Sequence, residues 1–148
     1  MLDYLTILFS LVIGIAAILT SWKLIKLFLE TGKWNRVEAK VLSKEVVFNN
    51  LSRSPRTPYT VLIEYSYQIN NKDYRGSKLD LVELIGGFSS YRKPIAEERM
   101  GQIKEKEMVY VNPNDHAQSV MNRKGITLYL IVFIMGLFAL LFGIAKFF

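Results

Sequence analysis

Two long uncharged apolar runs, residues 4–22 and 125–145, stand on either side of a polar segment with strand-like patterning. A hydrocarbon core of about 30 Å takes about 20 helical residues, because a helix rises about 1.5 Å per residue. Within lipid the backbone must satisfy its own hydrogen bonds, so apolar runs of this length favour helices. Tyr4 and Trp22 stand at the edges of the first run, as aromatic residues do at membrane interfaces. The pattern predicts two transmembrane helices.

Each run has an alternative interpretation. The first could be a cleaved signal peptide, but it lacks a basic leading region and is followed by Lys23 and Lys26 rather than by a small-residue cleavage site. The second could be a buried soluble helix, which its length and lack of charge disfavour. We predict that both are retained. We also predict that the first helix continues to residue 30, with its lysines reaching the headgroups from an apolar face.

Each predicted span carries small residues at steps of three and four. Small residues let helix backbones approach closely, and packing drives helix association in lipid. They predict a helix pair, either within one chain or between the chains of a homo-oligomer, although Gly is common in membrane helices in any case. The candidate packing residues are Ser10, Gly14, Ala17 and Ser21 on the first span, and Gly136, Ala139 and Gly143 on the second.

Between the runs, the apolar period changes to two. Val37, Ala39 and Val41 fall on one side of the chain, which predicts a first strand with a bulge near Ser43. The polar residues 49–58 predict a mobile hairpin loop. The clearest strand pattern covers residues 59–69, followed by a turn over 70–73 and a returning strand over 74–81.

The rest of the middle segment predicts smaller elements. Residues 94–103 are typical of a short helix with Pro94 near its start, residues 104–107 form a charged linker, residues 108–111 form a last strand, and residues 119–121 add a short edge strand. The expected fold class is therefore a membrane protein of α+β type, with two transmembrane helices flanking a small antiparallel β-rich domain with one short helix. The expected division of the chain is 1–30, 31–122 and 123–148.

Two features of this middle domain are candidates for a partner surface. Arg53 and Arg56 make the 49–58 loop basic. Tyr59, Tyr65 and Tyr67 lie on one face of the clearest strand. A tyrosine row of this kind is more often core, with its hydroxyls reaching the rim, than a recognition surface.

Composition limits the chemistry that the 148 residues can carry. The chain has no Cys and one His, which excludes disulfides, thiolate nucleophiles and metal sites built from Cys or several His. Membrane flanks explain the net charge of +6 better than nucleic acid does, since no basic cluster is interleaved with stacking aromatics. The sequence displays no nucleophile–base pair, phosphate loop or ligand set. We therefore expect no enzymatic activity, no cofactor and no nucleic-acid partner.

Several short pieces of the chain fall in a recognisable order. They are Trp34 with Val37-Glu38-Ala39-Lys40-Val41, then Tyr65-Ser66-Tyr67 ahead of Tyr74-Arg75-Gly76, then Val109-Tyr110-Val111-Asn112-Pro113-Asn114, then Ser119. With the two spans, this layout resembles the bacterial membrane family called domain of unknown function thirty-five ninety-two. The resemblance covers nearly the whole chain. It implies a small β-rich domain between two spans, and it implies no activity and no functional residues.

Charges near the span ends predict a topology. Four Lys and Arg residues follow the first span between positions 23 and 36, and Arg123 and Lys124 precede the second. Positive charge at span ends favours the cytoplasm, although a loop of this length can also translocate despite its charge. We expect a multi-pass protein of the bacterial inner membrane with a cytoplasmic middle domain.

Two classes of function are open at this point. The first is a non-enzymatic interaction protein, whose β domain binds a protein partner at the membrane in a role of the immunity or envelope-assembly type. The basic loop and the exposable strand edges motivate this class. The alternative is an accessory subunit or small oligomeric channel or transporter element, although neither apolar run contains an ionisable residue.

Overall fold

The computed structural model describes residues 2–50, 52 and 55–147, and the chain divides into two compact units. The helical unit comprises Met1–Glu30 and Gly125–Phe148, and the β unit comprises Thr31–Lys124. The two long apolar helices therefore flank the β unit in the sequence, as the hydrophobic pattern predicts.

The helical unit consists of α1 (Leu2–Thr31) and α3 (Ile126–Phe147). Both helices are long and apolar enough to cross a membrane. Most of their side chains are exposed, and Phe9 and Phe138 are 65% and 69% exposed. Neither helix is therefore the buried core helix of a globular domain.

Small residues mark the place where α1 and α3 pack together. A Cβ at Gly14 would lie 2.9 Å from the carbonyl oxygen of Gly136, and a Cβ at Gly136 would lie 3.0 Å from the Cβ of Ala17. A Cβ at Gly143 would meet the side chain of Leu11 at 2.9 Å. The backbones approach so closely that larger residues would not fit, which is the packing that small residues permit. Ser10, Ala17 and Ala139 are half-buried, and the three glycines are buried.

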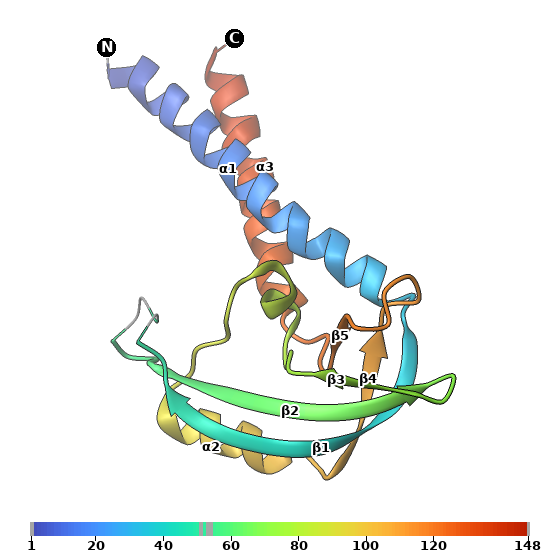
Figure 1. Ribbon diagram of the computed structural model, residues 1–148. Helices are drawn as coiled ribbons and strands as arrows, with labels where there is room; N and C mark the ends of the chain where they lie inside the picture. Colours follow the sequence, from blue (N-terminus) through green and yellow to red (C-terminus); the bar gives the residue numbers. More distant parts are fainter. Residues whose placement is uncertain (1, 51, 53–54, 148) are drawn as a thin grey trace. The chain divides into compact units, whose positions relative to one another are not determined.

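The β unit is built on an antiparallel sheet of five strands in the order β3-β2-β1-β4-β5 (Figure 1). The strands are β1 (Asn35–Phe48), β2 (Tyr59–Ile69), β3 (Lys72–Gly76), β4 (Lys106–Val111) and β5 (Ser119–Val120). The β1–β2 register shifts between Val41 and Ser43, which confirms the bulge predicted near Ser43. One short helix, α2 (Lys93–Gln102), packs against β1 and β2. The predicted antiparallel β-rich domain with one short helix is confirmed.

The returning strand differs from its prediction. The chain reverses through Asn70 and Asn71, whose positive φ angles of 52° and 62° suit a two-residue hairpin turn, so β3 begins at Lys72. β3 ends at Gly76 rather than at residue 81, and a 3₁₀ helix, η1 (Leu81–Ile85), follows. The backbone of residues 78–80 pairs instead with Met121 and Asn122, which follow β5. The stretch at 104–107 also differs from its prediction, because β4 begins at Lys106.

The core of the β unit centres on β2. Tyr65 is fully buried and Tyr67 is 3% exposed, and both belong to one cluster with Ile63, Leu79 and Val109. The Tyr65 hydroxyl donates to the carbonyl of Lys78 at 3.2 Å and pairs with Ser119 Oγ at 3.1 Å. The Tyr67 hydroxyl donates to the carbonyl of His116 at 2.7 Å. As candidates for an exposed partner surface, Tyr65 and Tyr67 are therefore wrong, because their rings fill the core and their hydroxyls are bonded to the backbone or to Ser119.

Candidate functional site

The outer edge of β2, which faces away from β1, is only partly covered by β3. β3 covers the second half, from Tyr65 paired with Gly76 to Ile69 paired with Lys72. After Gly76 the chain leaves the sheet, and it returns to the same edge at Tyr91, which pairs with Tyr59. The intervening residues 77–90, here called the arch, therefore leave and rejoin the same strand.

The uncovered stretch leaves backbone groups of Val61 and Ile63 facing outward. In an antiparallel pair, alternate residues direct their N–H and C=O groups to the same neighbour. Tyr59 exchanges two backbone hydrogen bonds with Tyr91 on the outer side of β2. The alternation therefore directs Val61 and Ile63 to the outer side, and directs the residues between them to β1. Within the part of the chain that the structure describes, no strand pairs with Val61 or Ile63 on that side.

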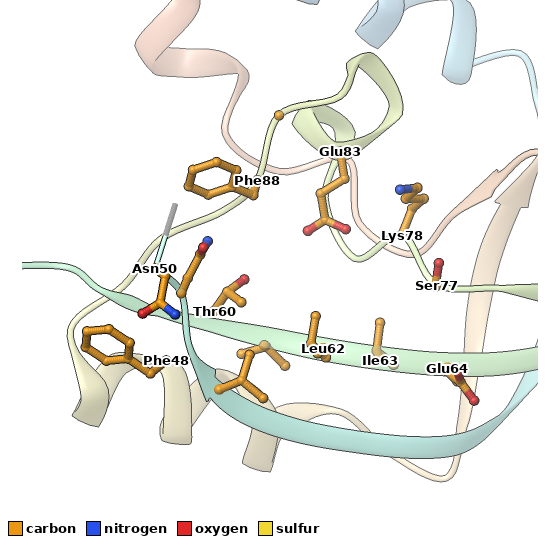
Figure 2. Close-up of a pocket in the computed structure, with 14 residues that line it drawn as sticks. Phe48, Asn50, Thr60, Leu62, Ile63, Glu64, Ser77, Lys78, Glu83 and Phe88 are labelled. Atoms are coloured by element: carbon orange, nitrogen blue, oxygen red, sulfur yellow. The ribbon is translucent and has the colours of Figure 1, made fainter. Parts of the chain in front are cut away.

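A groove with a volume of about 450 Å³, here called the edge groove, lies between this stretch and the arch. Figure 2 shows Glu83 projecting from the arch toward β2, with Phe88 beside it and Phe48 at one end. Phe48, Leu62 and Phe88 are 61%, 49% and 40% exposed, so they give the groove an apolar surface. Its polar lining residues are Asn49, Asn50, Thr60, Glu64, Ser77, Lys78 and Glu83.

A partly buried ion pair ties the arch to α2. Asp80 Oδ1 lies 3.2 Å from Nη2 of Arg99, with the two side chains 9% and 25% exposed. The other carboxylate oxygen accepts hydrogen bonds from Ser89 Oγ at 2.8 Å and from the Tyr91 hydroxyl at 2.6 Å. The Arg99 guanidinium also lies over the Tyr91 ring, 4.8 Å from its centre. Asp80 thus joins both ends of the arch to one side chain of α2.

Glu83 is the acidic group that the arch presents to the groove. Its Oε2 accepts a hydrogen bond from the Leu79 N–H at 2.9 Å. Burial raises the pKa of Glu83, and the bond from the Leu79 N–H partly offsets that rise. The Tyr91 pKa is also raised, chiefly by burial and then by the bond that its hydroxyl donates to Asp80. Tyr91 therefore acts as a hydrogen-bond donor here and not as an acid.

The edge groove offers backbone donors and acceptors beside apolar side chains. Ser89 and Ser90 do not form a nucleophilic pair, because Ser89 Oγ donates to Asp80 and Ser90 Oγ pairs with Ser52 Oγ at 3.1 Å. Among the residues that the structure describes, no group of three or more His, Asp or Glu side chains is placed to hold a metal ion. The arrangement suits recognition of a backbone and of apolar groups.

The residues predicted as a partner surface fall in different places. Tyr59 is half-buried near one end of the groove, with its ring 5.7 Å from that of Phe48. Arg56 is exposed in the loop between β1 and β2. Arg53 lies outside the described residues. Tyr65 and Tyr67 lie in the core, so the structure does not bring these five residues together into one surface.

The pattern of the sequence does not predict the edge groove. Val61 and Ile63 have the alternation of ordinary core residues, and the two residues are only 3% and 2% exposed. That alternation does not show which backbone groups face a neighbouring strand. Leu62 is one signal of the groove in the sequence, since it is an apolar residue on the otherwise polar side of β2. Phe88 follows Gly86-Gly87, and Gly86 has a φ of 80° at the end of η1. A large apolar residue just after such a break is a second, weaker signal.

One protein family matches most of this structure. The family described as "Domain of unknown function (DUF3592)" matches residues 37–126. The chain belongs to this family. The matched range of DUF3592 runs from β1 to the first residue of α3, and it includes the arch, α2 and the edge groove. Among curated proteins, none matches the chain closely enough to count as a relative.

Proposed function

We propose that this DUF3592 chain is a membrane-anchored, non-enzymatic binding protein that captures an extended segment of a partner protein. The partner segment would add to the free edge of β2 as an extra strand. The observation that carries this proposal is the outward-facing backbone of Val61 and Ile63 in a preformed groove.

The membrane location rests on α1 and α3. Both helices expose large apolar side chains along most of their length, and water would oppose that exposure. An apolar solvent such as lipid removes this cost, and the uncharged runs are long enough to span it. The Lys and Arg residues that follow the first run and precede the second favour a cytoplasmic β unit at the inner membrane.

Strand addition suits the geometry of the edge. Successive outward-facing residues of a strand lie about 6.6 to 6.8 Å apart, which is the repeat of any extended peptide. The open positions lie between Tyr91 and Gly76, so a segment of about four residues would fill them. A volume of about 450 Å³ falls within the range of ordinary ligand sites.

The side chains of the groove indicate the composition of the segment. Phe48, Leu62 and Phe88 would contact alternate apolar residues, because alternate side chains of an added strand point to the same side. Glu83 and Lys78 stand on the arch and would contact polar or charged residues at its ends. The backbone would supply affinity and these pockets would supply specificity.

Crosslinking inside cells tests the proposal. The photoreactive residue p-benzoylphenylalanine would replace Leu62 in the groove, and in a matched control it would replace Leu42, which is 46% exposed on β1. We expect one recurrent segment of one protein to crosslink at position 62 and not at position 42. Equal products from both positions, or products without a recurrent segment, would contradict the proposal.

The crosslinked segment then allows a direct binding test. A synthetic peptide of that sequence should bind the full chain in mild detergent and should bind Val61→Pro at least about tenfold more weakly. Proline removes the outward N–H of Val61 without removing a donor to β1. Val61→Ala is the control, because it also shortens the buried side chain but keeps the N–H. Equal weakening by both variants would show that packing, and not the edge, governs binding.

A further inference from the structure

A second feature of the β unit lies where its chain connects to the two long helices. Thr31 is the last residue of α1, and Arg123 lies three residues before α3. The Arg123 Nε donates to Thr31 Oγ1 at 3.2 Å, and Thr31 is fully buried. The two ends of the β unit are thus held side by side, so residues next to them stand close to both helix connections.

Two guanidiniums meet one tyrosine ring at this place. Arg36 on β1 pairs directly with Tyr110 on β4, so their side chains are cross-strand neighbours. The Cζ of Arg36 lies 5.6 Å from the centre of the Tyr110 ring, and the Cζ of Arg123 lies 5.2 Å from the same centre. Each arginine gains from the electron-rich ring, which partly offsets the repulsion between the two cations.

The surrounding sequence adds charge of the same sign. Residues 31–37 and 116–124 contribute Lys33, Arg36, Arg123 and Lys124, and they contain no Asp or Glu. On β1, the nearest acidic residue beyond Arg36 is Glu38, whose Oε1 already pairs with Lys106 at 3.0 Å. The ring of Tyr110 and these four residues are here called the basic collar. The collar is a positive surface at the two ends of the β unit, where the chain continues into α1 and α3.

We propose that the basic collar binds the phosphates of anionic phospholipid headgroups. Arginine presents a planar fork of N–H donors that matches phosphate oxygens, and a guanidinium held against a ring loses less freedom on binding. A bilayer surface rich in anionic lipid attracts basic groups that stand beside a span. The four basic residues of the collar lie two to five residues from the ends of α1 and α3 along the chain, so they remain near the headgroups when these helices span a bilayer. This inference rests on the membrane location proposed above and is independent of the edge groove.

Lipid selectivity measured by electron paramagnetic resonance tests the inference. The full chain would be reconstituted into phosphatidylcholine vesicles that contain spin-labelled phosphatidylglycerol or spin-labelled phosphatidylcholine. The motionally restricted fraction of each label reports how strongly the protein prefers one headgroup. We expect the wild-type chain to prefer phosphatidylglycerol. The variant with Arg36→Gln and Arg123→Gln should lose that preference by about fivefold or more at low salt.

The matched control removes two charges from elsewhere in the β unit. Lys40 and Lys104 are both exposed and lie outside the collar, so Lys40→Gln with Lys104→Gln should keep the preference for phosphatidylglycerol. A preference lost equally in both double variants would show that net charge alone acts, and would overturn the inference. An unchanged preference in the arginine variant, or no preference in the wild-type chain, would also overturn it.

Co-flotation of the protein with the vesicles, measured first, separates this inference from the membrane proposal. A chain that does not float with the vesicles contradicts the membrane location itself. A chain that floats but shows no headgroup preference contradicts only the collar.

Discussion

Tyr91 and Tyr59 exchange two backbone hydrogen bonds, of 2.7 and 3.1 Å. This pair joins the chain that follows the arch to the first residue of β2. The same Tyr91 donates its hydroxyl to Asp80, near the start of the arch. Tyr91 therefore connects the end of the arch both to the edge of β2 and to Asp80 near the start of the arch. The gap in the sheet between Tyr91 and Gly76 is thus fixed by the fold.

The ion pair between Asp80 and Arg99 should contribute strongly to stability. Replacing Arg99 with Met leaves the Asp80 carboxylate partly buried without its partner, and losses of about 3 kcal/mol are typical of that change. We expect a large fall in the unfolding temperature of the full chain in detergent. The matched control is Lys93→Gln, which breaks the exposed pair with Glu97 at 3.9 Å and should cost less than about 1 kcal/mol. Similar losses in both variants would contradict the role given to Asp80.

The carboxyl of Glu83 should make stability depend on pH. Because its pKa is raised in the folded state, the folded chain holds this proton more tightly than the unfolded chain does. The stability that this proton confers is complete below the unfolded pKa of about 4.5 and is lost as the pH rises through the folded pKa. Glu83→Gln should therefore show a flatter fall in unfolding free energy from pH 4 to pH 7 than the wild-type chain. Parallel pH profiles would contradict the burial of this group.

The close approach of α1 and α3 should tolerate no added bulk. Gly14→Leu places a side chain against the backbone of Gly136 and should cost roughly 1 to 3 kcal/mol, the usual penalty of overpacking. Unfolding in increasing concentrations of a denaturing detergent would measure the loss in free energy of unfolding. Ala16→Leu adds similar bulk at an exposed position of α1 and should have little effect. If Ala16→Leu is as damaging as Gly14→Leu, the small residues do not define the packing face.

The proposed cytoplasmic side can be tested with one thiol. The chain has no Cys, so Arg56→Cys in the exposed β1–β2 loop would carry the sole thiol of the protein. A membrane-impermeant thiol reagent should label it only after the cells are lysed. Labelling of intact cells would place the β unit outside the cytoplasm, and the search for its partner would move there.

The sequence predicts the parts of this fold that depend on local pattern. The alternation around Val37 and along residues 59–69 predicts β1 and β2, because one buried face enforces a period of two. Pro94 marks the start of α2 to within a residue. The bulge near Ser43 is also visible, because the apolar residues change sides there.

The site could not be predicted in the same way, because long-range contacts create it. Residues 77–81 have a strand-like pattern, but the backbone of residues 78–80 pairs with Met121 and Asn122 and not with β2. The Asp80 side chain binds Arg99 of α2. The alternation of apolar and polar residues along β2 predicts which way the side chains of Val61 and Ile63 point. It does not predict whether a neighbouring strand pairs with their backbone. The basic collar likewise needs the register of Arg36 with Tyr110, which only the folded sheet defines.

Amide hydrogen exchange along β2 tests the central claim most directly. Nuclear magnetic resonance of the full chain in detergent micelles would follow the amides of Val61 and Ile63 beside those of Leu62 and Glu64. The free edge predicts that Val61 and Ile63 exchange roughly a hundredfold faster than Leu62 and Glu64, whose N–H groups face β1. Equal, strong protection of all four amides would show that the edge is already covered, and would contradict the capture of a partner strand at this site.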